Sequence, residues 1–251
     1  NLEERDAAIS QLREILRQER EAFGADHANT LNTQGNLGIV LVGADQLEEA
    51  ESMLRDGLDR ARSSLGGDAP ETVTIMTGLS QLYWQRRELE PVKDLNALIF
   101  EANRKRFGDL HPATVSALHN LAVAYFLADD REFYAGKKDW DAPDLRRASE
   151  LFAEAAEKGK ALYGEDHPSP YSSQFMHGVT RLNLGEYDVA EGAFREVAEA
   201  NERLSGPDSQ GVFSAKGQLA RLYIRLERFE EARDLMAGAV DGAERVLGED
   251  H

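Results

Sequence analysis

The chain has 251 residues, enough for one large domain or two small ones. Its 46 acidic residues outnumber its 29 lysines and arginines, and the net charge of −17 argues against nucleic acid or an anionic membrane as a partner. Cysteine is absent, which excludes disulfide bonds and thiolate metal sites and favours a reducing, cytoplasmic location. No apolar run reaches the roughly 18 residues of a membrane span, and no signal peptide opens the chain.

A leading helix is expected at residues 1–23, and a short polar phrase, "FGADH", follows it at Phe23–His27. The phrase returns as "FGDLHP" at Phe107–Pro112, as "YGEDHP" at Tyr163–Pro168 and as "GEDH" at Gly248–His251. Because the chain begins at Asn1 without methionine and stops inside this phrase, we expect it to be a fragment of a longer protein.

The glycines of the phrase measure the chain in steps of 42, 42, 56, 42 and 42 residues. They are Gly24, Gly66, Gly108, Gly164, Gly206 and Gly248. The same steps separate a column of mostly small residues, Ala8, Ala50, Val92, Ala148, Ala190 and Ala232, and a third column agrees, Leu31, Val73, Val115, Tyr171 and Phe213. Three columns in register predict a 42-residue repeat with one 14-residue insertion.

Each repeat reads as two helices. In "TVSALHNLAVAYFLA", residues 114–128, apolar side chains recur every three or four positions, which is typical of a helix with one buried face. In "LEEAESMLRDGLDRARSSLG", residues 47–66, the buried face of the second helix runs through Leu47, Ala50, Leu54 and Leu58. The sequence therefore predicts an all-α solenoid of eleven helices in one array over 1–251, with repeats at about 27–66, 69–108, 111–164, 167–206 and 209–248.

The phrase is interpreted as the joint between consecutive repeats. Glycine ends a helix cheaply, the aspartate is expected to accept amide hydrogens at the next helix start, and proline suits the first helical turn. A metal site shared by the histidines is excluded, because equivalent joints lie two helices apart, roughly 16–20 Å, whereas ligands lie about 2 Å from a metal. No cofactor is expected.

These residues resemble the tetratricopeptide repeat. The family's small, aromatic and alanine positions match Leu219, Ala220, Tyr223, Phe229 and Ala232, with partial matches at Leu121, Ala122 and Tyr125 and at Gly178, Tyr187 and Ala190. The 42-residue unit and its joint are similar to the kinesin-light-chain variety, which is common in bacterial signalling arrays. The resemblance implies a right-handed superhelix whose first helices line a concave, peptide-binding wall. Four residues depart from the pattern and suggest loose packing or special roles: Val92, Asn96, His177 and Arg181.

Candidate groove residues lie on the first helices and do not pack on their own partner helix: Asn32, Asn36, Thr77, Gln81, Trp84, His119, Asn120, Val123, Phe126, Phe175, Met176, Gln218, Arg221 and Arg225. The resemblance implies that Asn36 and Asn120 hold a ligand's backbone amide; alternatively, they only stabilise the helix pair. Arg221 and Arg225 share one face and could bind a carboxylate or phosphate. The alternative is a solvated face, or pairing with the acids of "LERFEEARD".

The insertion falls near 127–141, between the two helices of the third repeat. Its aromatic residues Phe133, Tyr134 and Trp140 either fold back on the protein or contact a partner. A longer first helix with a return at Gly136 would also fit the sequence.

The function expected from these features is a non-enzymatic scaffold that binds a protein or peptide partner. The alternative is a sensor array that controls a kinase or NTPase domain elsewhere in the full-length chain. An enzyme is disfavoured and no catalytic residue is assigned, because the phosphate-loop, zinc-protease, serine-hydrolase and dinucleotide motifs are missing. The sequence does not define an oligomeric state.

Overall fold

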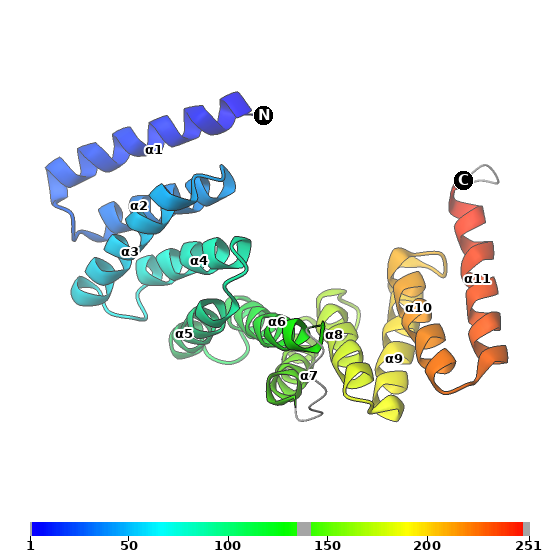
Figure 1. Ribbon diagram of the computed structural model, residues 1–251. Helices are drawn as coiled ribbons and strands as arrows, with labels where there is room; N and C mark the ends of the chain where they lie inside the picture. The colour runs from blue at the N-terminus through cyan, green and yellow to red at the C-terminus, as the bar shows by residue number, and fades with distance from the viewer. Residues whose placement is uncertain (1, 135–141, 248–251) are drawn as a thin grey trace. The chain divides into compact units, whose positions relative to one another are not determined.

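The computed structural model describes residues 2–134 and 142–247, and within these ranges it contains eleven α-helices and no strand (Figure 1). The helices are α1 (Leu2–Phe23), α2 (Ala28–Gly43), α3 (Leu47–Ser64), α4 (Pro70–Gln85), α5 (Leu89–Phe107), α6 (Pro112–Tyr134), α7 (Pro143–Tyr163), α8 (Ser169–Asn183), α9 (Tyr187–Ser205), α10 (Gln210–Arg225) and α11 (Phe229–Leu247). They group into two compact units, Asn1–Ala124 and Tyr125–His251.

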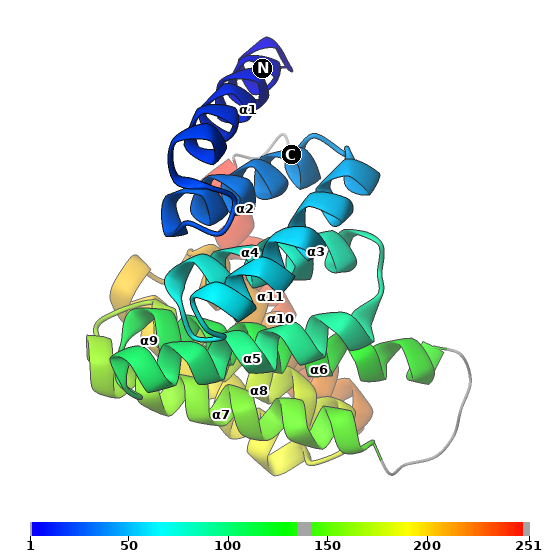
Figure 2. The ribbon, with the colours of Figure 1, turned by 90° about the vertical axis from the view of Figure 1, so that its left-hand side faces the viewer.

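In the first unit, consecutive helices pack against each other, and α2 also packs directly on α4 (Figure 2). Leu31, Leu54 and Ile75 are completely buried in the shared core, one residue from each of α2, α3 and α4. Because each helix buries its apolar face against both its own repeat and the next one, no single helix pair forms a hydrophobic core by itself.

The second unit follows the same scheme, with α8 packing on α7, α9 and α10, and α10 packing on α9 and α11. Leu182, Phe194 and Leu222 are buried in one of its core clusters. The all-helical, repeat-stacked fold expected from the register of the columns is therefore present in each unit.

The joints between repeats are built by glycine and histidine. Gly108 follows α5 at φ 83° and ψ 177°, a conformation that is essentially restricted to glycine. The Nδ1 atom of His111 then accepts the amide hydrogen of Ala113 at 3.2 Å, and its ring stacks on Phe107 with centroids 4.3 Å apart. His27 and His167 make the same contacts at their own joints.

The expectation that the joint aspartate caps the next helix is wrong. At the three joints with a histidine, the imidazole ring accepts that amide hydrogen, and α4 and α10 begin without a side-chain cap. The aspartates instead pair with a base on the second helix of the following repeat. Asp26 accepts from Arg60 at 3.0 Å, and Asp166 accepts from Arg203 at 3.3 Å. The joint therefore fixes the register of neighbouring repeats as well as the helix start.

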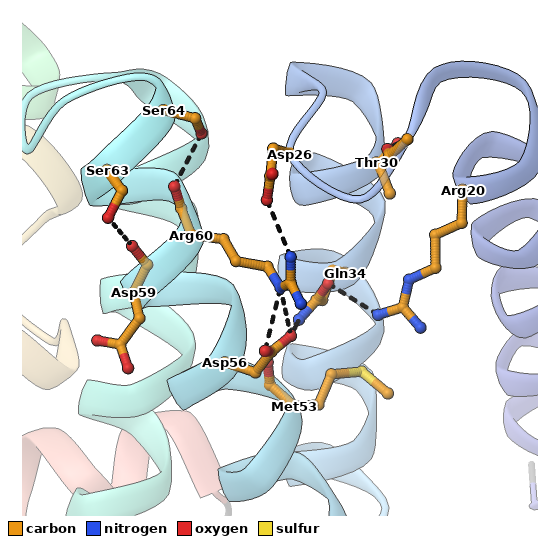
Figure 3. A network of polar contacts seen from close by, with 11 residues as sticks. Arg20, Asp26, Thr30, Gln34, Met53, Asp56, Asp59, Arg60, Ser63 and Ser64 are labelled. Atoms are coloured by element: carbon orange, nitrogen blue, oxygen red, sulfur yellow. Dashed lines mark hydrogen bonds and ion pairs between the residues drawn. The ribbon is translucent and has the colours of Figure 1, made fainter.

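A polar network joins α1, α2 and α3 in the first repeat (Figure 3). Arg20 donates to the amide oxygen of Gln34 at 3.0 Å, and Gln34 donates onward to Met53 O at 2.8 Å and to Asp56 at 3.1 Å. Arg60 completes the network by donating to Asp56 at 3.0 Å. In the second unit, Lys160, Gln174 and Glu196 occupy the equivalent positions, and both Lys160 and Gln174 donate to Glu196.

A second network lies where α9 meets α10. Tyr223 donates its hydroxyl to Glu191 at 2.7 Å, and Arg195 and Arg228 donate to the same carboxylate. Burial raises the pKa of Glu191, but these three hydrogen bonds outweigh burial and hold that pKa below its usual value. The carboxylate is therefore charged in the folded protein at neutral pH.

The residues that depart from the repeat pattern are accommodated without loose packing. Val92 is completely buried, and Asn96 is 8% exposed but accepts from Ser80 at 2.8 Å and donates to Asn120 O at 3.2 Å. His177 is also buried, and its Nδ1 lies 3.0 Å from Ser149 O, so it behaves as a satisfied core histidine. Arg181 forms an ion pair with Glu186.

Part of the insertion lengthens a helix. With 23 residues, α6 is longer than α2 and α4, which have 16 each. Gly136 and Trp140 lie outside the described residues, as do the side chains of Phe133 and Tyr134. Contacts of these three aromatic side chains therefore remain predictions.

Candidate functional site

The first helices of the repeats each leave one stripe of side chains uncovered. In α2, Asn32 and Asn36 are exposed on this stripe and Ile39 is half-buried. The rest of α2 packs on three neighbours, α1, α3 and α4. A helix that is covered on three sides can offer a ligand only the remaining side.

The stripe of α4 lies beside that of α2, because the two helices pack directly. Gln81 is exposed and Trp84 is 43% exposed, so this stripe presents an amide and an indole. Thr77 is half-buried, and its hydroxyl donates to Val73 O in its own helix at 2.9 Å. Contact between the stripes is close at Gly78, where a Cβ would lie 3.1 Å from Ile39.

In α6 the candidate residues fall on both sides of the boundary between the units. Asn120 exposes its side chain, while its backbone oxygen accepts from Asn96. Burial lowers the pKa of the half-buried His119, which keeps the imidazole neutral at pH 7. Val123 is half-buried in the first unit, and Phe126 is half-buried in the second.

In α8 and α10 the side chains of the stripe are less accessible. Phe175 and Met176 are half-buried, and the Phe175 ring lies against Phe194 with centroids 5.7 Å apart. Gln218 is half-buried, and its amide oxygen is enclosed without a hydrogen-bond partner among the described residues. Gln218 therefore does not present its amide as Asn36 and Asn120 do.

Two arginines end the stripe of α10. Arg221 is exposed, and Arg225 is exposed but donates to Leu182 O of α8 at 3.1 Å. Two of the acids that follow are engaged elsewhere, since Glu231 pairs with Arg228 and Asp234 with Arg233. The structure therefore leaves Arg221 as the more accessible guanidinium of the two.

Charge is distributed very unevenly between the two kinds of helix. In α2, α4, α8, α10 and residues 112–128 of α6, Glu71 is the single acidic residue. The second helices hold most of the charge; α3 alone carries five acids and three arginines. In a chain of net charge −17, the exposed stripes are thus uncharged in the first unit and basic at the end of α10.

Other site types gain no support from the part of the chain that the structure covers. Among the described residues, no three histidine, aspartate or glutamate side chains gather as a possible metal site. Within the same ranges, no helix combines the length and apolarity needed to cross a membrane.

Comparison with known proteins agrees with this architecture. Residues 1–63 and 212–251 match two models of the tetratricopeptide repeat family. A clustered mitochondria protein homolog from Candida albicans is 27% identical over 100 residues, which is 40% of this chain but only 7% of that protein's length.

Solved structures with the same fold extend the likeness over nearly the whole chain. The structure of BtubC (BKLC) from P. vanneervenii superposes with a TM-score of 0.74 and 17% identity, covering 100% of this chain and 94% of that one. TPR-like repeats from Podosopora anserina, assigned to a kinesin light chain, superpose with a TM-score of 0.71 and 17% identity, covering 89% of this chain and 99% of that one. Residues 1–63 and 212–251 therefore carry tetratricopeptide repeats, and the fold of the chain is like that of kinesin-light-chain-type repeat arrays.

Proposed function

We propose that this array is a non-enzymatic interaction module whose exposed first-helix stripes bind a segment of a protein partner. Tetratricopeptide repeats generally mediate protein–protein interaction, and the chain carries this repeat at both ends. The observation that carries the proposal is the separation of charge, because the stripes lack acids while the rest of the molecule is strongly acidic. An acidic partner segment is therefore repelled less by the stripes than by the strongly charged second helices.

Within the first unit, exposed amide side chains are the groups that would form hydrogen bonds with such a segment. Asn32, Asn36 and Gln81 are exposed, and an amide can both donate to and accept from an extended backbone. Trp84 offers a large, partly exposed ring beside them as an apolar anchor. This combination favours an uncharged, extended segment with one apolar side chain.

Within the second unit, the end of α10 favours a different ligand. The guanidinium of Arg221 can take a carboxylate or phosphate in a bidentate contact, with Arg225 four residues further on. We propose that the partner segment read by this unit is acidic where it passes α10. A cytoplasmic location and a role in signalling belong to the same proposal. No observation on the described residues favours control of a kinase or NTPase domain over plain binding.

The proposal is tested with peptides selected for binding from a random library. Asn36→Ala should weaken the selected peptides about fivefold, the loss expected from one or two hydrogen bonds. The control is Gln11→Ala, which removes an exposed amide from α1, outside the stripes. Equal effects of the two substitutions, or a failure to select any peptide that depends on the stripes, would refute the proposed function.

A further inference from the structure

The network in Figure 3 has an altered counterpart one repeat later. Forty-two residues beyond Arg20, Gln34 and Asp56 stand Arg62, Met76 and Leu98. The base is kept, but the amide that accepts from it and the carboxylate that accepts from this amide are replaced by two apolar side chains. The fourth repeat retains all three polar groups as Lys160, Gln174 and Glu196, whereas the third has Leu118 in place of the amide.

Arg62 consequently lies over an apolar surface. Its guanidinium is 4.0 Å from the sulfur of Met76, which is 1% exposed, and no carboxylate among the described residues pairs with it. Leu98 occupies the position of Asp56 and is 46% exposed. Around these residues is an open pocket of about 590 Å³, the size of many ligand sites, floored by Met76 and Ala102.

The charges on the rim of the pocket leave one cation without a partner. Lys105 pairs with Asp68 at 2.5 Å, and Arg104 pairs with Glu101 at 2.6 Å. Arg62 is the remaining charged group of the lining. The pocket therefore offers one positive charge beside an aliphatic surface, inside a chain whose net charge is strongly negative.

We propose that this pocket binds a carboxylate side chain of a partner protein, flanked by an aliphatic side chain. The carboxylate pairs with Arg62, as the amide oxygen of Gln34 pairs with Arg20 one repeat earlier, and the aliphatic group covers Leu98 and Met76. The site is made by α3, α4, α5 and the joint at residues 65–69, so it is separate from the first-helix stripes and goes beyond the function proposed for them.

A short peptide containing Leu-Asp-Leu between serines, blocked at both ends, is the probe, and the same peptide with Asn for Asp is its control. The chain is labelled at its methionine methyl groups, and the Met76 signal is followed by NMR during titration. We expect a saturable shift with the aspartate peptide and at least about fivefold weaker binding of the asparagine peptide, since an uncharged amide forms no ion pair with Arg62.

Substitutions sharpen the test. Arg62→Gln should weaken the aspartate peptide about fivefold. The control Arg147→Gln removes an exposed arginine that pairs with Glu150 in α7 and is no part of the pocket lining, so it should change affinity less than twofold. Leu98→Asp should abolish binding, because it places a carboxylate of the chain itself in the lining of the pocket, where it repels the aspartate of the peptide and competes for Arg62. Leu98 is 46% exposed, and thermal unfolding should show that this variant is folded.

Three results would overturn the inference: equal binding of the two peptides, equal effects of Arg62→Gln and Arg147→Gln, or unaltered binding to the Leu98→Asp variant. Hexanoate is a second probe, and a Met76 shift with hexanoate but none with the peptide would overturn the assignment to a protein segment. Asn36→Ala should leave peptide binding at this pocket unchanged. Failure here is therefore distinguishable from failure of the proposed stripe function.

Discussion

Replacing Gly38 by alanine should destabilise the first unit, because Leu54 already fills the space beside it. An alanine Cβ at position 38 would lie 2.4 Å from Cδ2 of Leu54 and 2.5 Å from its Cγ. Carbon atoms in contact normally lie about 3.5–4.0 Å apart. Leu54 is completely buried and cannot easily turn away, since its Cδ2 also lies 2.9 Å from the Cβ position of Gly78 on α4.

The expected change in the free energy of unfolding of Gly38→Ala follows from two opposing effects. Overpacking a core costs about 1–3 kcal/mol, and the upper end applies here because the clash reaches Cγ and not only a side-chain tip. Alanine in place of glycine inside a helix contributes about 1 kcal/mol in the other direction. The free energy of unfolding should therefore fall by about 2 kcal/mol.

Urea unfolding provides the assay. The chain has two tryptophans, so a Trp140→Phe background leaves Trp84 of α4 to report on the first unit. Gly43→Ala is the control, because nothing lies within 4 Å of its new Cβ, and it should shift stability by no more than about 0.5 kcal/mol. The clash should disappear in a Leu54→Ala background. A similar loss from Gly38→Ala in both backgrounds would refute the reasoning.

Three further predictions test other parts of the structure. Glu227 has a φ of 59°, and Glu227→Gly should raise the free energy of unfolding by about 0.5 kcal/mol, seen as a higher Tm, whereas Gly185→Ala, at φ 77°, should lower it. The pKa of Glu191 is lowered on folding. Its contribution to stability is therefore present above the unfolded pKa of about 4.3 and is lost as the pH falls through the folded pKa. In denaturant titrations, the free energy of unfolding of Glu191→Gln should be lower than that of the parent by about 1 kcal/mol at pH 7 and by less at pH 3. Asn96→Leu should lower the free energy of unfolding by about 2 kcal/mol, because it leaves the buried hydroxyl of Ser80 unpaired. Adding Ser80→Gly recreates the pair formed by Gly38 and Leu54 in the first repeat and should recover at least half of that loss in the same assay.

Much of the fold could be predicted because the repeat constrains the backbone and the small residues. A glycine at each joint and a mostly small residue at the start of each second helix recur at fixed spacing, and spacing is visible in the sequence. The details of the joint were not visible. Both the aspartate and the histidine are plausible caps, and the ring of His111 reaches the amide of Ala113 only because it is stacked on Phe107. Such a choice depends on three-dimensional geometry.

The candidate site was predictable only as a set of helix faces. Spacing places Asn36 and Gln218 at equivalent positions, yet one side chain is exposed and the other turns its amide oxygen inward. Asn96 departs from the repeat pattern when only the equivalent positions of the other repeats are compared. Read together with the small-residue column, it pairs with Ser80, so a comparison of columns could have found this contact. The pocket at Arg62 would have been found in the same way.

The uneven charge follows from how the repeats hold together. The second helices carry the ion pairs that link neighbouring repeats, as Arg13 with Glu49 and Arg60 with Asp26. The first helices pack on neighbours by close contact of small and apolar residues, so a charge there would be either buried at high cost or placed on the exposed stripe. Residues on that stripe can change without disturbing the stacking, as the uncharged stripe of α2 and the basic end of α10 illustrate. Ligand choice and array stability are thereby assigned to different helix faces, and for this reason substitutions such as Asn36→Ala and Gly38→Ala, two residues apart, should have separable effects on binding and folding.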